Sequence, residues 1–371
     1  MNDVFSALEN LSALKPEQFE TAAILKKAMT AGRKLAELKG LAASMPNDGI
    51  LINTLAMQEA KDSSAIENIV TTHDELFKSD AFPEMGNPAA KEVRHYIQAL
   101  HIGHELVTRT GLLTSNHIIQ IQAELEKNRA GFRKLPGTAL KDGQGNTVYT
   151  PPQEPDTIIA LMRDLEHFIN DDAVFDADPL IKMAIIHHQF ESIHPFYDGN
   201  GRTGRIINVL YLMQKGLLDI PLLYLSRHIV RNKADYYRLL QSVREGDDRA
   251  AAWEEWVLYM LSAVEETAQH SIETVTLIRD AVMDYKHRIR DNFRFYSQDL
   301  INSLFQHPYT KIEFIEHDLN VSRLTATKYL DALCKEGFLE KRKVGRSNYY
   351  INRELNRILT RDEAKAPVVS Q

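Results

Sequence analysis

One short segment, residues 193–205, brings together the residue types that phosphate chemistry needs. It reads IHPFYDGNGRTGR and holds one histidine, one acid, three glycines and two arginines. Pro195 disfavours the helical conformation at His194, so the chain must turn there. The residues that follow have a helical pattern, so the glycine-rich turn leads into a helix N-terminus, where unpaired N–H groups and the positive end of the helix dipole bind anions. The segment therefore predicts a phosphate-binding loop with a histidine at its edge.

The charged side chains of this loop suggest distinct roles. Arg202 and Arg205 offer two guanidinium groups suited to phosphate oxygens. Asp198 is unsuited to binding phosphate directly, but Mg²⁺ takes one or two carboxylates together with phosphate oxygens. His194, with an ordinary pKa of about 6.5, could take a proton from an attacking hydroxyl at neutral pH. These residues together indicate nucleotide phosphates, a metal ion and a base.

The composition sets limits on the rest of the chain. With 371 residues, 44% hydrophobic and 26% charged, it is typical of a globular protein of two or three domains. The single cysteine, Cys334, excludes an internal disulfide framework. The sequence shows no signal peptide and no apolar run of the length of a membrane span, so we expect a cytoplasmic protein without membrane contact. The net charge of −7 argues against nucleic-acid binding by the whole surface.

Most of the chain has the three- and four-residue apolar spacing of helices. This spacing predicts helices over 21–43, 48–62, the 90s, the 110s, 155–170, 179–193 and 251–293. Residues 131–152 differ, because short extended runs flank the turn sequence KDGQGN and end at a Pro-Pro pair, which predicts a β-hairpin. The expected fold class is therefore all-α with one small β-hairpin flap.

The loop sequence also resembles a known family. HPFYDGNGRTGR, residues 194–205, matches the Fic signature HPFx(D/E)GNGRxxR at every fixed position, and the resemblance covers about residues 50–250. Fic proteins mostly transfer AMP from ATP to a Ser, Thr or Tyr hydroxyl of a target protein. The resemblance thus implies a Fic fold and a protein adenylyltransferase that uses ATP and Mg²⁺ and has a hydroxyl-bearing target protein as its partner.

Carried over by position, the family's site residues fall within three segments. The resemblance implies that His194 is the general base and that Asp198 is the Mg²⁺ ligand. It implies that the ATP phosphates are bound by Gly199, Asn200, Gly201, Arg202 and Arg205, with Arg205 at the γ-phosphate. It places Val148, Tyr149 and Thr150 where the flap clamps an extended target segment, and Tyr236 and Tyr237 beside the nucleobase, although adjacent aromatics on a helix more often pack in the core.

A second motif precedes the loop. SSAIEN, residues 63–68, resembles the inhibitory pattern (S/T)xxxE(G/N) of some Fic proteins, in which the glutamate pairs with the last arginine of the signature. Ser63 and Glu67 would then hold Arg205 and keep transfer low, and the enzyme would be able to modify itself. The same letters fit a capping box, in which Ser64 and Glu67 would close the N-terminus of a helix. Both readings stay open from the sequence.

Residues 300–351 form a different unit that resembles a winged helix, with two helices, a recognition helix over 323–337 and a hairpin around KVGRSN. Residues 321–348 carry a formal charge of +4, whereas 297–320 carry −3, so the basic side is the recognition helix and the wing. Winged helices bind DNA or proteins, and both partners stay open. The candidate DNA contacts are Arg323, Thr325, Thr327, Lys328, Arg342, Lys343 and Arg346.

The expected organisation has four parts: an N-terminal helical region over 1–85 with the inhibitory motif, a Fic catalytic domain over 86–285, a winged helix over 286–358 and a disordered tail over 359–371. Two alternatives remain for the function: a DNA-binding regulator whose Fic domain only senses nucleotide, and a transferase of another nucleotide or phosphate-containing group. A homodimer is considered as well, and the sequence names neither the target nor the modified residue.

Overall fold

The structure is a computed structural model that describes residues 10–82, 86–344 and 347–361. Its contacts divide the chain into two compact units: unit 1 with residues 1–39, 59–69 and 95–269, and unit 2 with residues 40–58, 70–94 and 270–371. The expected domain boundaries at 85 and 285 stay a prediction, and residues 362–371 of the expected tail lie outside the described residues. Among the described residues, no helix is both long and apolar enough to cross a membrane.

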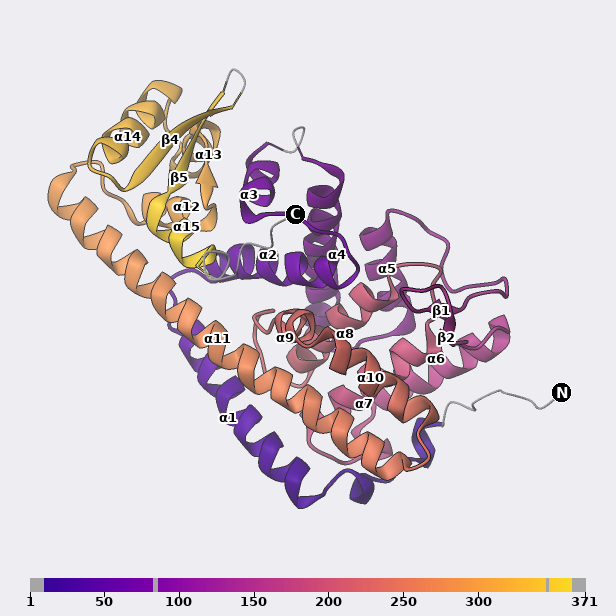
Figure 1. The fold of residues 1–371 in the computed structure, drawn as a ribbon. Helices are drawn as coiled ribbons and strands as arrows, with labels where there is room; N and C mark the ends of the chain where they lie inside the picture. The colour runs from indigo at the N-terminus through magenta and orange to yellow at the C-terminus, as the bar shows by residue number, and fades with distance from the viewer. Residues whose placement is uncertain (1–9, 83–85, 345–346, 362–371) are drawn as a thin grey trace. The chain divides into compact units, whose positions relative to one another are not determined.

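Unit 1 is built mainly from helices (Figure 1). Four helices contribute residues to both units, namely α1 (Ala22–Ala43), α2 (Asp48–Ile66), α4 (Pro88–Thr110) and α11 (Arg249–Asn292). The other α-helices described in unit 1 are α5 (Ser115–Glu126), α6 (Pro155–Asn170), α7 (Pro179–Ile193), α8 (Asn200–Gln214), α9 (Leu225–Arg231) and α10 (Lys233–Glu245). Short 3₁₀ turns lie at Leu11–Ala13, Pro16–Gln18 and Asp172–Val174. The predicted all-helical body is confirmed, and α2 runs four residues beyond the range that its periodicity indicated.

Helices α7 and α8 form the centre of unit 1. Every residue of α7 from Leu180 to Ile193 is buried, which explains why its sequence is apolar on nearly all sides. Helix α8 packs against α7 and α5, and α6 packs against α7. The loop that joins α7 to α8, residues 194–199, is the predicted phosphate-binding loop, so two buried helices fix both of its ends.

The predicted flap is a hairpin of strands β1 (Leu140–Lys141) and β2 (Thr147–Tyr149), which pair antiparallel with Leu140 opposite Tyr149. Its turn is closed by Asp142, whose Oδ1 accepts the N–H groups of Gln144 and Asn146 at 2.9 Å each. Gly145 has φ = 86°, a backbone conformation that favours glycine. The expected hairpin is therefore confirmed, with shorter strands than the sequence indicated.

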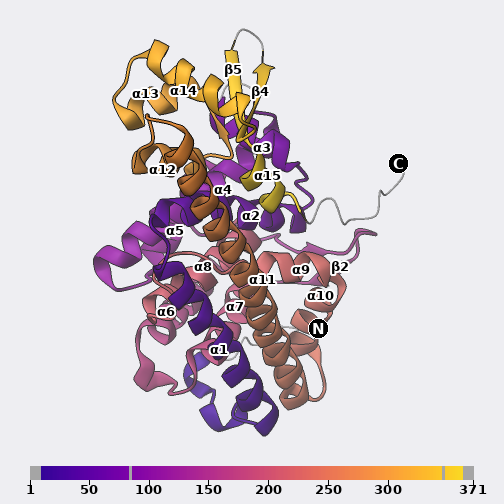
Figure 2. The ribbon, with the colours of Figure 1, turned by 90° about the vertical axis from the view of Figure 1, so that its left-hand side faces the viewer.

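Unit 2 contains a small mixed domain, seen in Figure 2. Its elements are α3 (His73–Ala81), α12 (Gln298–Gln306), β3 (Tyr309–Thr310), α13 (Ile312–Leu319), α14 (Arg323–Lys335), β4 (Leu339–Val344), β5 (Ser347–Asn352) and α15 (Arg353–Leu359). The three strands form an antiparallel sheet in the order β3-β5-β4. Helices α12, α13 and α14 and the β4–β5 hairpin lie where the sequence indicated them, whereas α3, α15 and the two-residue strand β3 were not expected.

Candidate active site

The histidine of the loop lies in a strained conformation at the end of α7. His194 has φ = 49° and ψ = 57°, in the left-handed region, and its N–H donates to the Phe190 carbonyl at 2.9 Å. Pro195 explains why α7 stops here. A left-handed backbone is unfavourable for a residue with a Cβ and persists only where the surroundings impose it. The surrounding structure must therefore hold His194 in place.

Two arginines and a tyrosine hold His194 in place, because they donate hydrogen bonds to the carbonyls at the end of α7. The buried Arg133 donates from Nε to the His194 carbonyl at 2.8 Å and from Nη2 to the Pro152 carbonyl at 2.8 Å. Arg244 donates to the Glu191 carbonyl at 3.1 Å, and its guanidinium lies 4.1 Å from the Tyr149 ring centroid. The Tyr149 hydroxyl donates to the Ser192 carbonyl at 2.9 Å. The flap residue Tyr149 is thus an anchor of the loop.

The same arginines set the charge of the histidine. Burial, together with the positive charges of Arg133 and Arg244, lowers the pKa of His194 to about 4, although the Glu67 carboxylate opposes this shift. The imidazole is therefore neutral at pH 7. A neutral imidazole is the form that can accept a proton from a hydroxyl group.

The residues after His194 give the loop its shape. The side-chain amide of Asn200 bridges the Phe196 backbone, accepting from its N–H and donating to its carbonyl, both at 2.9 Å. Phe196 is fully buried and packs against Phe132 and Phe190. Gly199 has φ = 76° and is the N-cap of α8. The predicted anion site is thus the N-terminus of a buried helix preceded by a glycine in a left-handed conformation.

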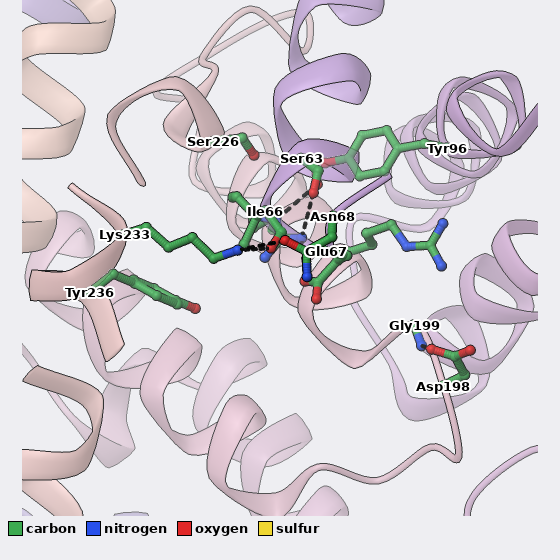
Figure 3. A network of polar contacts seen from close by, with 12 residues as sticks. Ser63, Ile66, Glu67, Asn68, Tyr96, Asp198, Gly199, Ser226, Lys233 and Tyr236 are labelled. Atoms are coloured by element: carbon green, nitrogen blue, oxygen red, sulfur yellow. Dashed lines mark hydrogen bonds and ion pairs between the residues drawn. The ribbon is translucent and has the colours of Figure 1, made fainter. Parts of the chain in front are cut away.

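Asp198 lies beside this helix N-terminus with its carboxylate exposed. Its Oδ1 accepts the Gly199 N–H at 2.7 Å (Figure 3). Over the residues that the structure describes, no group of three or more His, Cys, Asp or Glu side chains could hold a metal ion. The exposed Asp198 side chain offers one carboxylate, and a Mg²⁺ ion can take one carboxylate from a protein and its remaining ligands from phosphates and water.

Arg205 is held by the second motif. Its side chain is 1% exposed. Nε donates to the Ser63 hydroxyl at 2.8 Å, and Nη2 donates to the Ser63 carbonyl at 2.9 Å and to Glu67 Oε1 at 2.8 Å. Burial alone would raise the pKa of Glu67, but Arg205, helped by Arg202 and Lys233, lowers it below its usual value. The structure thus brings together Ser63, Glu67 and Arg205 through charge-assisted hydrogen bonds.

The end of α2 explains the rest of the motif. The helix stops at Ile66, and Asn68 has φ = 63°, a conformation that glycine and asparagine adopt most readily. The Ile69 N–H donates back to the Ser64 carbonyl at 3.0 Å, and Lys233 Nζ donates to the Ile66 carbonyl at 2.6 Å (Figure 3). Glu67 therefore lies just past a helix C-terminus, where a negative charge is unfavourable unless cations neutralise it.

This position excludes the capping-box reading of SSAIEN. Ser64 and Glu67 lie at the end of α2, so no helix N-terminus is available for them to cap. The capping box in this part of the chain is formed at α3 instead, where Thr72 and Glu75 bond to each other's backbone N–H groups. The pattern S/T-x-x-E occurs at both places, and only the course of the helices separates them.

The two candidate base-pocket tyrosines have different environments. Tyr236 is buried, its hydroxyl is 2.9 Å from His187 Nε2, and its ring packs against Trp256. The side chain of Tyr237 is 46% exposed. Tyr236 is therefore a core residue in this structure, and Tyr237 is the tyrosine available to a ligand.

In unit 2, three basic side chains of α14 and β4 are paired with acids. Arg323 Nη1 lies 2.7 Å from Glu313 and 3.4 Å from Glu316, Lys341 lies 2.8 Å from Asp331, and Arg342 lies 2.7 Å from Glu340. Thr327 donates to the Arg323 carbonyl, and the Thr325 N–H donates to the N-cap Ser322. Lys328 and Lys343 are exposed, and Arg346 lies outside the described residues. The side chain of Leu324, on the same helix, is 85% exposed.

Arg133 and Arg244 are not among the site residues predicted from the sequence. Their partners are backbone carbonyls of α7, which leave no pattern in the sequence. A basic side chain near a helix C-terminus is favourable in general, but neither arginine is close to α7 in the chain. No sequence signal pointed to them.

Three family descriptions match the chain: the Fic/DOC family N-terminal domain over 25–105, the Fic/DOC family over 112–212, and the protein adenylyltransferase SoFic-like C-terminal domain over 282–355. Among similar proteins, protein adenylyltransferase fic-1 of Caenorhabditis elegans is 29% identical over 133 residues, 36% of this chain and 24% of that protein. Protein adenylyltransferase Fic of Aedes aegypti is 35% identical over 149 residues, 40% of this chain and 28% of that protein. The matched stretches thus span about a quarter of each relative.

Solved structures show the same fold. A Fic family protein from Desulfovibrio desulfuricans superposes with a TM-score of 0.57 and 21% identity, covering 91% of this chain and 98% of the other. Residues 134–508 of Fic-1 from C. elegans give a TM-score of 0.51 at 21% identity, covering 68% and 72%. The intact signature, the matched family descriptions and the shared fold lead to one conclusion: the chain belongs to the Fic/DOC family.

Proposed function

We propose that this chain is a protein adenylyltransferase that moves AMP from ATP to a Ser, Thr or Tyr hydroxyl of a target protein. The observation that carries the proposal is the position of His194, held at the edge of a helix N-terminus that presents two buried arginines. The relatives that match the chain are named protein adenylyltransferases, which agrees with this chemistry.

In the proposed reaction, the target hydroxyl oxygen attacks the α-phosphorus of ATP. A new P–O bond forms to the target, the bond from the α-phosphorus to the bridging oxygen breaks, and pyrophosphate leaves. His194 accepts the hydroxyl proton, and the carbonyl contacts of Arg133 and Arg244 hold the histidine in position. The N–H groups at the start of α8 and the two signature arginines stabilise the phosphates. Mg²⁺, held by Asp198 and by phosphate oxygens, would supply neutralisation of the phosphate charge.

The flap is proposed to align the target segment by strand addition to β2, residues 147–149. Val148 is 42% exposed, which suits contact with a target side chain. Its carbonyl accepts the side-chain amide of Gln241 at 2.8 Å. A target strand that uses this carbonyl must therefore displace Gln241, whereas Tyr149 stays in its place below the flap.

We further propose that Glu67 inhibits the enzyme and that slow self-modification is the basal activity. Ser63 and Glu67 take up Nε and Nη2 of Arg205, so the γ-phosphate could not use these donors and ATP would bind in a pose unfit for in-line attack. A Cβ built on Gly201 would lie 2.3 Å from Glu67 Oε1, so this carboxylate lies directly against the backbone of the anion site. To keep only about 1% of the molecules in the state that can transfer AMP, the inhibited state must be about 2.7 kcal/mol more stable. One largely buried arginine–carboxylate pair can supply this difference.

The second candidate function is binding of DNA by unit 2. The element order α12, β3, α13, α14, β4 and β5 is the order expected of a winged helix. The exposed Lys328 and Lys343 support a local, salt-dependent contact with phosphates. The ion pairs of Arg323, Lys341 and Arg342, and the exposed Leu324, support a protein partner instead.

The first experiment is to incubate the purified chain, its Glu67→Gly variant and a Glu67→Gly/His194→Ala control with each nucleoside triphosphate and a protein extract, and then to weigh the protein products. The proposal expects a mass increase of one AMP with ATP, largest for Glu67→Gly and absent in the control. An adduct from another nucleotide would favour the alternative transferase. ATP binding without any adduct would favour a nucleotide sensor.

A further inference from the structure

A second glutamate, Glu126, lies in the anion site. It is the last residue of α5, and the next residue, Lys127, has φ = 51°. Glu126 Oε1 accepts from Arg202 Nη2 at 2.8 Å, and the side chains of the two residues are only 11% and 5% exposed. Both arginines of the signature are therefore bound to carboxylates, Arg202 to Glu126 and Arg205 to Glu67.

The carboxylate of Glu126 also contacts the backbone of the loop. A Cβ built on Gly199 would lie 2.3 Å from Glu126 Oε1 and 3.0 Å from its Cγ. Position 199 therefore needs glycine for two reasons, the left-handed φ and the close approach of Glu126. Another contact comes from the same face of α5, where Gln122 donates from Nε2 to the Asp198 carbonyl at 3.2 Å. The last turn of α5 thus supports the segment from Asp198 to Arg202.

The two glutamates differ in how they are anchored. Glu67 follows the last residue of α2, and its side chain is 35% exposed. Glu126 belongs to a regular helix that packs against α8, and its neighbour Leu125 is fully buried. Withdrawing Glu67 requires movement of a helix end only. Withdrawing Glu126 requires a shift of α5 or burial of an unpaired charge, which is costly.

We propose that Glu126 is a positioning residue that keeps Arg202 oriented toward the phosphates and stays paired with it while nucleotide is bound. Arginine has five N–H donors, so a guanidinium that gives Nη2 to Glu126 retains others for a phosphate. Fixing the side chain beforehand avoids the loss of rotamer freedom that binding would otherwise cost. This inference rests on the proposed function, because it takes the triphosphate of ATP as the ligand of Arg202.

The direction in which removal of Glu126 changes the affinity for ATP distinguishes a positioning role from a blocking role. If Glu126 only repelled the phosphates or blocked Arg202, its removal would tighten ATP binding, because like charges oppose each other. If Glu126 positions Arg202, its removal weakens ATP binding despite the gain in positive charge. A Gln at this position keeps a carbonyl oxygen that can accept from Arg202, so it should preserve much of the contact.

The test measures dissociation constants in the Glu67→Gly background, with Mg-ATP and with adenosine, which has no phosphates. We expect Glu126→Ala to weaken ATP binding by about tenfold, or ~1.4 kcal/mol, with adenosine binding unchanged and Glu126→Gln in between. Glu124→Ala is the matched control, because it removes a carboxylate of the same helix that pairs with Lys127. It should leave both constants unchanged.

Tighter ATP binding by Glu126→Ala would overturn the inference and make Glu126 a second blocking group. Equal weakening of ATP and adenosine would also overturn it and assign Glu126 to the fold. If the Glu67→Gly parent binds ATP but transfers no AMP, the proposed function fails while the comparison of Glu126 variants still holds. If the parent binds neither ligand, both proposals fail.

Discussion

The signature loop in unit 1 and the basic face of unit 2 both contain paired arginines, but the pairs differ in burial. Arg205 has a side chain that is 1% exposed and donates to Ser63 and Glu67, whereas Arg323 has a side chain that is 61% exposed and lies beside Glu313 and Glu316. Buried charge-assisted hydrogen bonds fix one geometry, while exposed ion pairs exchange readily with water and salt. A charge pattern thus predicts a site only where the fold also removes the charges from water.

The largest effect is expected at the residue proposed to do the chemistry. Replacing His194 with Ala in the Glu67→Gly background should reduce AMP transfer by about 10²–10⁴-fold, since the general base is lost. ATP binding should persist because the arginines and the helix N-terminus remain. Transfer of labelled AMP and equilibrium binding of ATP, measured on the same samples, check this. Loss of ATP binding together with transfer would assign His194 a structural role.

Burial in unit 1 also predicts a pH dependence. Glu59 is 1% exposed and accepts from the Tyr96 hydroxyl at 3.0 Å and from the Ser226 N–H at 3.2 Å. Burial raises the pKa of Glu59 to about 7, although Ser226, Arg205 and Tyr96 oppose the shift. Because the folded state holds this proton more tightly than the unfolded state, the stability due to it is fully present below pH 4.5. It is lost as the pH rises through about 7.

The Glu59→Gln variant should remove this dependence. From pH 5 to pH 8, the parent should lose up to about 3 kcal/mol of unfolding free energy relative to the variant, at about 1.4 kcal/mol per pKa unit. Urea unfolding followed by tryptophan fluorescence is the measurement, since Trp253 and Trp256 are the chain's two tryptophans and both lie in unit 1. If the unfolding free energies of the parent and the variant differ by the same amount at every pH in this range, the burial argument is contradicted.

The next prediction compares one arginine from each region. Arg205→Ala should lower the unfolding free energy of unit 1 by about 3 kcal/mol, because it leaves buried partners without their donor. Arg323→Ala should leave the thermal midpoint nearly unchanged, since its pair is exposed. Arg205→Ala should also fail to activate transfer, because it removes the γ-phosphate contact together with the inhibitory pair. Similar stability losses for both variants would break the comparison between the two regions.

The smallest effect is expected at the wing. Replacing Arg342, Lys343 and Arg346 with Ala should weaken binding of duplex DNA and make it less sensitive to salt, because up to three phosphate contacts are lost. AMP transfer should not change. Binding to a pool of genomic fragments at several salt concentrations measures this. If the intact protein retains no duplex at low salt, a protein partner is the better proposal for unit 2.

The sequence could predict the elements whose pattern is local. The proline after His194 and the glycines before α8 are enough to predict a turn that feeds a helix N-terminus. The end of α2 was not predictable from periodicity, because the residues after 62 continue the helix without an apolar pattern, and only Asn68 marks its end. Arg133, Arg244 and Glu126 escaped prediction because their partners come from distant parts of the chain.

The central claim is that a transferase site is held closed by Glu67 against Arg205. The most direct test is the rate of AMP transfer, including self-modification, by the Glu67→Gly variant and by the parent at saturating ATP. The account predicts an increase of about tenfold or more, together with a lower thermal midpoint, because the buried Arg205 loses its carboxylate partner. A Glu67→Gly protein that is folded, binds ATP and transfers AMP no faster than the parent would contradict it.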